Sequence, residues 1–136
     1  MKVSIIIPVY NEQDFIKKSI ESIINQTTKP HKVIYVNDSS TDKSRSIIEE
    51  FSEKYKWIDL VDHESKQQHV PGSKVVDAFN FGLKNLNINY DIICKFDADI
   101  ILPNNYLEKL IDIFSRNKNV GLSLIHISEP TRRLVI

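Results

Sequence analysis

Two kinds of apolar segment alternate along this chain of 136 residues, and their alternation limits the folds that it can adopt. Residues 3–7 form a short, mostly β-branched run, which is typical of a strand covered on both faces. In residues 12–25, isoleucines recur at the interval of one helix face, at Ile16, Ile20, Ile23 and Ile24. The same succession predicts further strands at 32–36, 57–61 and 91–96, each followed by a helix. Because no hairpin signal separates the strands, the sequence predicts an α/β fold with a mostly parallel sheet flanked by helices.

Composition narrows the classes of ligand that such a sheet could bind. The 18 Lys and Arg residues balance 18 Asp and Glu residues, which argues against nucleic acid as the main partner, because phosphate backbones select basic surfaces. The single cysteine, Cys94, excludes an internal disulfide and a cysteine-built zinc site. The three glycines, Gly72, Gly82 and Gly121, fit neither the dinucleotide fingerprint nor the phosphate-binding P-loop. Metal ions or basic side chains would therefore have to hold any phosphate group.

The sequence gives no sign of export or of membrane insertion. Residues 1–9 lack the cleavage site of a secretory signal, and no apolar stretch reaches about 18 residues, the minimum for a spanning helix. We therefore expect a cytoplasmic, soluble protein.

Polar residues gather where the predicted strands end, which is where open parallel sheets bind ligands. Asp97 and Asp99 follow the fourth strand, and in an extended chain residues two apart point to the same side. Two carboxylates at this spacing suit a hard divalent ion such as Mg²⁺ or Mn²⁺. Surface aspartates at this spacing are also common, so it is the position at a strand end that favours a metal site.

Other residues at these ends fit a structural role as well as a ligand contact. Asp38 closes a buried strand, where its carboxylate could accept a hydrogen bond from an imide or a ribose hydroxyl. Glu12 fits either a ligand contact or a favourable interaction with a helix dipole. We expect Ser40 and Thr41 to cap the second helix. Lys74 precedes the third helix, where it could contact a diphosphate or simply be solvated.

Four stretches occur in an order that is more specific than any one of them. They are residues 4–12 (SIIIPVYNE), 36–42 (VNDSSTD), 78–83 (AFNFGL) and 96–99 (FDAD). Together they resemble family 2 glycosyltransferases of the GT-A fold. The resemblance implies an incomplete Rossmann-like GT-A domain, a nucleotide-diphospho-sugar donor, with a UDP-sugar as the first choice, and a Mn²⁺ or Mg²⁺ cofactor. It also implies transfer of the sugar, with inversion at its anomeric carbon, to a carbohydrate or lipid-linked acceptor, and no nucleic acid partner. The family further implies a part in cell-surface polysaccharide biosynthesis and peripheral association of the full-length protein with the inner face of the membrane.

The resemblance also assigns roles to residues of this chain. Those expected to contact the donor are Pro8, Tyr10, Glu12, Asp38, Ser40, Lys74, Asn80 and Asp97. Asp38 would recognise the base, while Lys74 and Asn80 would lie in the segment that passes over the donor. Asp97 and Asp99 would form a D-x-D metal-binding pair, with Asp99 closest to the ion and Asp97 towards the ribose or a metal-bound water.

Catalysis would need more than a donor site. A metal can neutralise the diphosphate leaving group as a Lewis acid, but a general base must also take the proton of the acceptor hydroxyl. In the family this base is a carboxylate well downstream of the D-x-D pair, whereas here only Glu129 follows Asp112 among acidic residues, in a different context. We therefore expect the base beyond residue 121 and a chain that is inactive alone. The alternative is a noncatalytic nucleotide- or cation-binding α/β domain.

The segment 122–136 differs from the rest of the chain. Every lysine precedes Gly121, whereas this segment contains Arg132 and Arg133. The resemblance also stops there, where a fifth strand should begin. We therefore predict a donor-binding region at 1–121 and a non-native or divergent tail at 122–136, which looks like translated sequencing-adaptor read-through. The alternative is a true strand in which Leu122, Leu124 and Ile125 pair with the sheet edge.

Overall fold

The computed structural model describes residues 1–64, 73–116, 124–126 and 133–135. In chain order the elements are β1 (Val3–Val9), α1 (Ile16–Ile24), β2 (Lys32–Asp38), α2 (Ser44–Lys54), β3 (Ile58–His63), α3 (Ser73–Lys84), β4 (Ile92–Lys95), α4 (Tyr106–Arg116), β5 (Leu124–His126) and β6 (Arg133–Val135). The four predicted strand and helix pairs are present in the predicted order. Within the described ranges, no helix is both long and apolar enough to span a bilayer.

The strands form one sheet in the order β3-β2-β1-β4-β6-β5. All neighbouring strands are parallel except β5 and β6, which are antiparallel. This confirms the prediction of a mostly parallel sheet. The chain leaves the central strand β1 first towards β2 and β3, and it later returns to place β4 on the other side. The edge of the sheet between β1 and β4 is therefore a topological switch point, where ligands bind in folds of this kind.

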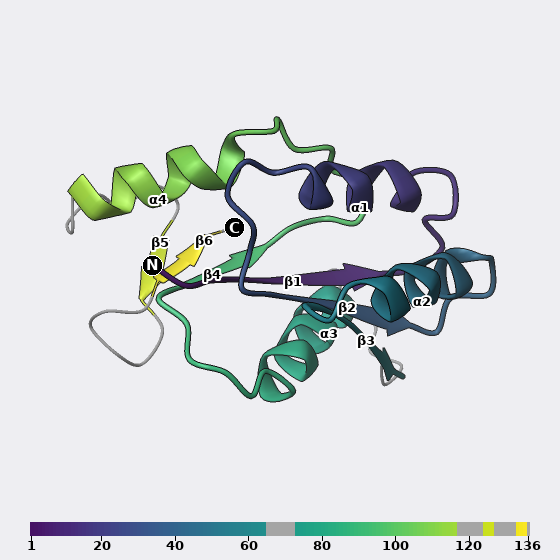
Figure 1. Ribbon diagram of the computed structural model, residues 1–136. Helices are drawn as coiled ribbons and strands as arrows, with labels where there is room; N and C mark the ends of the chain where they lie inside the picture. The colour runs from purple at the N-terminus through teal and green to yellow at the C-terminus, as the bar shows by residue number, and fades with distance from the viewer. Residues whose placement is uncertain (65–72, 117–123, 127–132, 136) are drawn as a thin grey trace.

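Helices cover both faces of the sheet, with α1, α2 and α4 on one face and α3 on the other (Figure 1). A hydrophobic core lies on each face of the sheet. Alternate residues of β1 pack in these two cores, because successive side chains of a strand point to opposite faces. Ile5 and Ile7 pack in the larger core with α1, α2 and α4, whereas Ile6 packs in the smaller core against α3. All three are completely buried, and each such side chain contributes about 1.5–3 kcal/mol to folding.

Gly82 lets α3 lie directly on the sheet. A Cβ atom at this position would be 2.7 Å from Cγ2 of Ile6 and 2.8 Å from Cγ2 of Val36. These distances are too short for real side chains, so any larger residue would push the helix away from β1 and β2. The close approach sets the position of the first turns of α3 at the carboxyl edge of the sheet.

Two helices begin later than their sequence patterns predict. The first begins at Ile16 rather than at Glu12, and α2 begins at Ser44 after the N-cap residue Lys43, whose side chain forms no capping bond. The prediction that Ser40 and Thr41 cap α2 is therefore wrong. The physical reason is that the segments before α1 and α2 hydrogen-bond to each other, which keeps both out of the helices.

Two short strands lie within the segment 122–136. In the sheet, β6 pairs in parallel with β4, and β5 forms the edge next to β6. Leu124 and Ile125 therefore belong to an edge strand, whereas Leu122 lies outside the described residues. The origin of the segment, and the boundary at residue 121, stay predictions.

Candidate functional site

A pocket of about 670 Å³ opens at the carboxyl edge of the sheet, beside the switch point. The ends of β1, β2 and β4, the residue after β3 and the first turns of α3 form its walls. Seven predicted site residues line it: Pro8, Tyr10, Glu12, Asp38, Lys74, Asp97 and Asp99. The fold thus brings together residues that are up to 91 positions apart in the chain.

Pro8 lies inside β1 rather than after it, and its position explains why β1 and β4 separate. The pairing of β1 with β4 ends at Ile6 and Lys95, whereas Pro8 still pairs with Val36 of β2. The Ile6 carbonyl accepts the Phe96 N–H at 3.4 Å, so the peptide groups of Ile6, and two residues later those of Pro8, face the β4 side. A proline there removes no ladder hydrogen bond. The space beyond this point belongs to the pocket.

Asn11 organises the loop that follows β1. Its backbone adopts a left-handed conformation, with φ of 49°, which asparagine tolerates better than most residues. Its side-chain Oδ1 accepts the backbone N–H groups of Thr41 at 2.8 Å and Asp42 at 3.3 Å. Its own N–H donates to Oγ of Ser40 at 3.1 Å. Ser40 therefore fastens the loop, and it is not one of the pocket-lining residues.

Further bonds join the same two loops. The Glu12 N–H donates to Oγ of Ser44 at 2.8 Å, and the Gln13 N–H donates to Oδ2 of Asp42 at 3.2 Å. Burial acts to raise the pKa of Asp42, but the hydrogen bonds from Ser44 and Gln13 prevail and hold this pKa below its usual range. Loop 10–13 and loop 39–44 are therefore fixed against each other beside the pocket.

Asp38 and Tyr10 lie at different depths of the pocket. Asp38, the last residue of β2, is only 9% exposed, whereas Tyr10 is 60% exposed. The next residue, Ser39, also lines the pocket and has a φ of 62°, the second positive φ of a non-glycine residue in the described chain. Such backbone strain persists only where neighbouring contacts hold it, and it concentrates at functional sites.

Asp97 begins a tight turn and Asp99 lies within it, so the two do not belong to an extended segment. The Ile100 N–H donates to the Asp97 carbonyl at 3.2 Å, so the prediction that an extended chain orients the two carboxylates is wrong. The residue between them, Ala98, is 4% exposed and packs in the larger core. This anchor leaves both aspartates exposed at the pocket.

Negative charge dominates the pocket. Its described lining includes one lysine, Lys74, and five acidic residues: Glu12, Asp38, Glu64, Asp97 and Asp99. Burial is the main cause that raises the pKa of Glu12, and repulsion from Asp99, Asp42, Asp97 and Asp14 adds to it. Carboxylates crowded in this way favour the binding of a cation.

The carboxylates at this pocket suit a hard divalent ion that takes its remaining ligands from the substrate and from water. In the described part of the chain, no three or more His, Cys, Asp or Glu side chains are placed to hold a metal ion together. Two carboxylates, Asp97 and Asp99, nevertheless line one pocket. Mg²⁺ is commonly bound in this way, by one or two carboxylates with phosphates and waters in the other positions.

Asn80 is the other predicted residue that does not line the pocket, because it lies exposed on α3. Six lining residues were not predicted: Val9, Ser39, Glu64, Val75, Ala78 and Ala98. Glu64 escaped notice because β3 runs to His63, two residues beyond the predicted end at Val61. Asn11 could have been recognised, since an asparagine directly after a strand is a common left-handed turn residue.

Comparisons with known proteins identify the family of this chain. The family model described as Glycosyl transferase family 2 matches residues 4–135. "Glycosyltransferase GlyA" of Streptococcus pneumoniae serotype 4 is 32% identical over 139 residues, which cover 93% of this chain and 19% of that protein. "Minor teichoic acid biosynthesis protein GgaA" of Bacillus subtilis is 29% identical over 127 residues, which cover 91% of this chain and 27% of that protein. The chain thus spans only 19% and 27% of the lengths of these two relatives.

Solved glycosyltransferase structures share the fold. TarS of S. aureus, crystallised with UDP, matches with a TM-score of 0.70 and 24% identity over 87% of this chain and 33% of that chain. The mannosyltransferase PcManGT of Pyrobaculum calidifontis, solved with GDP-Man and Mn²⁺, matches with a TM-score of 0.68 and 24% identity over 88% of this chain and 34% of that chain. The sheet and its flanking helices are thus those of the GT-A fold. Since the family model also matches nearly the whole chain, the chain belongs to glycosyltransferase family 2.

Proposed function

We propose that this chain binds the nucleotide-diphospho-sugar donor of an inverting, metal-dependent glycosyltransferase. The main support is the pocket at the switch point, where carboxylates from the ends of β1, β2 and β4 come together. Open α/β sheets bind ligands at this place. The nucleotides bound by TarS and PcManGT support a nucleotide-sugar as the ligand.

The nucleoside would lie at the ends of β1 and β2. Asp38 would accept a hydrogen bond from the imide of the base, and a buried carboxylate acceptor of this kind suits uracil. Pro8, Tyr10 and Glu12 would contact the nucleoside from the β1 side, with the exposed ring of Tyr10 available for stacking. Ser40 would support this side, and Asn80 would approach the donor from α3. A UDP-sugar is therefore the donor to test first.

The diphosphate would lie near the turn after β4. Asp97 and Asp99 would hold Mn²⁺ or Mg²⁺, with Asp99 closest to the ion, and the bound ion would neutralise negative charge on the leaving diphosphate. Lys74 would contact the diphosphate from the first turn of α3. A cation held here would also lower the repulsion that raises the pKa of Glu12.

We propose that the acceptor and the general base lie outside this pocket, with the base beyond residue 121, in a region that lies largely outside the described residues. On this proposal, the chain binds the donor without transferring its sugar. The relative named for teichoic acid biosynthesis supports a carbohydrate or lipid-linked acceptor for a cell-surface polymer. Such an acceptor favours action in the cytoplasm, at the inner face of the membrane.

Calorimetric titration tests donor binding. The purified chain is titrated with UDP, GDP and dTDP, each with and without Mn²⁺. We expect UDP to bind most tightly and Mn²⁺ to strengthen its binding, and we expect Asp99→Ala to remove the effect of Mn²⁺. Asp112→Ala is a matched control, because Asp112 is an exposed acid paired with Arg116 on α4. Absence of binding by all three nucleotides, or binding indifferent to both Mn²⁺ and Asp99→Ala, would contradict the proposal.

A radiolabelled UDP-sugar tests whether the chain stops at binding. If the donor is bound but neither hydrolysed nor transferred to added acceptors, the chain acts as a noncatalytic donor-binding domain when isolated. Release of the labelled sugar by the wild type, but not by Asp99→Ala, would show instead that this chain is catalytic.

A further inference from the structure

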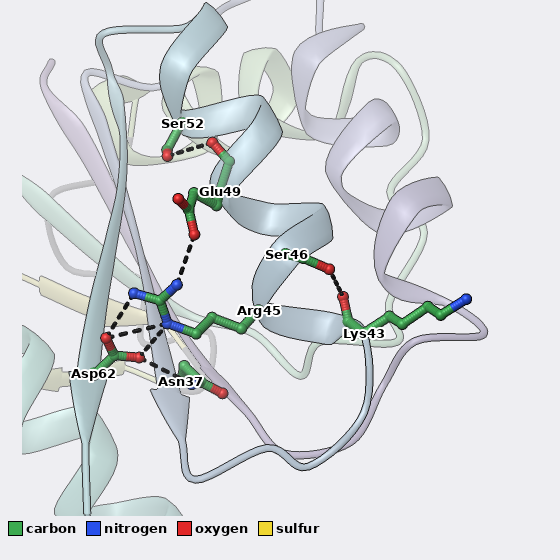
Figure 2. Close-up of polar contacts among 7 residues, drawn as sticks. All are labelled: Asn37, Lys43, Arg45, Ser46, Glu49, Ser52 and Asp62. Atoms are coloured by element: carbon green, nitrogen blue, oxygen red, sulfur yellow. Dashed lines mark hydrogen bonds and ion pairs between the residues drawn. The ribbon is translucent and has the colours of Figure 1, made fainter.

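A line of hydrogen bonds runs from α2 to the loops beside the pocket, through side chains that do not line the pocket. Figure 2 shows its first part, from Arg45 through Asp62 to Asn37. Arg45 donates from Nε to Oδ1 and from Nη2 to Oδ2 of Asp62, both at 2.9 Å. Oδ1 of Asp62 also accepts a bond of 2.9 Å from Nδ2 of Asn37. Oδ1 of Asn37 accepts the Ser40 N–H at 3.2 Å, and Oγ of Ser40 accepts the Asn11 N–H at 3.1 Å. We call Arg45, Asp62, Asn37 and Ser40 the relay.

The charged end of the relay sets the orientation of the amide in its middle. An ionised carboxylate can only accept hydrogen bonds, so Asp62 selects the NH₂ group of Asn37 and turns its oxygen towards Ser40. Hydrogen bonds from Arg45 and Asn37 hold the pKa of Asp62 below its usual range. Glu49 pairs with Nη1 of Arg45 at 2.6 Å, which keeps the guanidinium in place.

The relay holds the backbone on both sides of Asp38. Asn37, which is 5% exposed, precedes Asp38, and Ser40 follows two residues later. Between them, Ser39 adopts its left-handed conformation, which is unfavourable for a residue with a Cβ. The bond from the Ser40 N–H to Asn37 spans this strained turn, so it fixes the direction in which the chain leaves Asp38.

Stability alone does not account for this arrangement. The side chains of Arg45 and Asp62 are 46% and 55% exposed, and exposed ion pairs contribute little to the stability of a fold. On the same strand, Asp59 forms a comparable pair with Lys32 at 2.7 Å. Among the described residues, no hydrogen bond links the Lys32–Asp59 pair to the loops beside the pocket, so the two pairs differ in what they position.

We propose that Arg45 and Asp62 are positioning residues that act through Asn37 and Ser40 to hold Asp38 in place for the nucleoside of the donor. The inference rests on the proposed function of the pocket. The relay sets the affinity for the nucleotide and makes only a small contribution to the stability of the fold.

The first test compares Asp62→Ala with Asp59→Ala. Both variants remove an aspartate of β3 from a surface ion pair, but Asp62→Ala also leaves the buried Asn37 amide without its acceptor, so its loss of Tm should be somewhat larger than that of Asp59→Ala. Only Asp62→Ala should weaken the binding of UDP in the presence of Mn²⁺, by about tenfold, the size expected for a lost hydrogen bond to a charged group. Equal UDP affinities of the two variants would overturn the proposal. Arg45→Lys, which keeps the charge but lacks the two-pronged bond, should weaken UDP binding less than Asp62→Ala, and it replaces Asp62→Ala if that variant does not fold.

The second test needs no nucleotide. Solvent exchange of backbone amides, measured by NMR, should become several-fold faster at Ser40 and Asn11 in Asp62→Ala. The amide of Glu12, which donates to Ser44 outside the relay, should not change. Unchanged exchange at Ser40 would overturn the relay whatever the nucleotide data show. If the wild type binds no nucleotide, the proposed function fails and the role towards the nucleoside fails with it, while the exchange rates still decide whether the relay holds the loop.

Discussion

The two sides of the pocket are built in different ways. On the side of β1 and β2, loop 10–13 and loop 39–44 are fastened to each other by side chains that accept backbone N–H groups, among them Asn11, Ser40 and Ser44. On the side of β4, the turn with Asp97 and Asp99 is closed by one backbone bond, and neither carboxylate forms an ion pair with another described residue. The loops on one side are therefore fastened by hydrogen bonds, whereas Asp97 and Asp99 on the other side lack a counter-charge among the described residues.

This difference indicates how the two sides recognise a ligand. Loops held by internal hydrogen bonds present a fixed shape, and binding to them costs little ordering of the protein. Exposed carboxylates without a counter-ion repel each other until a cation binds. Recognition of the nucleoside should therefore depend on the loops alone, while recognition of the diphosphate should depend on the metal.

Removal of both metal-side charges should have the largest effect on binding. In the double variant Asp97→Asn, Asp99→Asn, we expect the gain in UDP affinity caused by Mn²⁺ to fall by about 100-fold, equivalent to about 2.7 kcal/mol. The affinity for uridine, which lacks phosphates, should stay unchanged. Titration of both ligands with and without Mn²⁺ measures this, and an equal loss for uridine and UDP would abolish the distinction between the two sides.

Gly82→Ala should disturb both sides together, because α3 forms a wall shared by them. The added methyl group would meet Ile6 and Val36, and overpacking of this kind costs about 1–3 kcal/mol. Urea denaturation should show a lower midpoint than in the control Lys84→Ala, an exposed change near the end of the same helix. An unchanged midpoint would mean that α3 can move away from the sheet without cost.

Asn11→Gly should weaken the loop side alone. Glycine adopts the left-handed backbone of Asn11 easily, so the variant removes the side-chain bonds to Thr41 and Asp42 without adding strain. We expect a loss of about 1 kcal/mol in stability and weaker uridine binding, with the response to Mn²⁺ preserved. The control is Asn85→Ala, because Asn85 does not line the pocket, and this variant should leave the affinity for uridine unchanged. Asn85→Gly is less suitable, because Asn85 lies at the end of a helix.

Glu12→Gln should have the smallest effect, and its sign depends on pH. Because burial and nearby carboxylates raise the folded-state pKa of Glu12 above its ordinary value of 4.5, the unfolded chain loses this proton first as the pH rises, and ionised Glu12 destabilises the fold. The variant should therefore be slightly more stable than the wild type at pH 7, by less than about 0.5 kcal/mol, and the difference should shrink below pH 4.5. Urea denaturation at both pH values, with Glu53→Gln as an exposed control on α2, checks this. A variant less stable at pH 7 would show that burial and the surrounding carboxylates do not disfavour ionised Glu12.

The fold was predictable because burial on both faces leaves a plain pattern in β1 and β2, whose central residues are nearly all apolar. The starts of α1 and α2 were not predictable. The bond from the Thr41 N–H to Asn11 joins residues 30 positions apart, and a local sequence pattern cannot predict such a contact. Strand ends predicted Pro8 and Asp38 as pocket residues, and the structure places both there. The roles of these residues towards a donor stay predictions.

Pro8 has a consequence for the speed at which a ligand can enter. Without an N–H group on that side, Pro8 cannot donate the next hydrogen bond of the ladder to the segment after β4, and the pairing of β1 with β4 ends at Ile6 and Lys95. A ligand then meets an open pocket, and we expect its rate of association to depend on diffusion and on the charge of the pocket. Because that charge is negative, Mn²⁺ should enter rapidly, and a free nucleotide should associate more slowly than its metal complex.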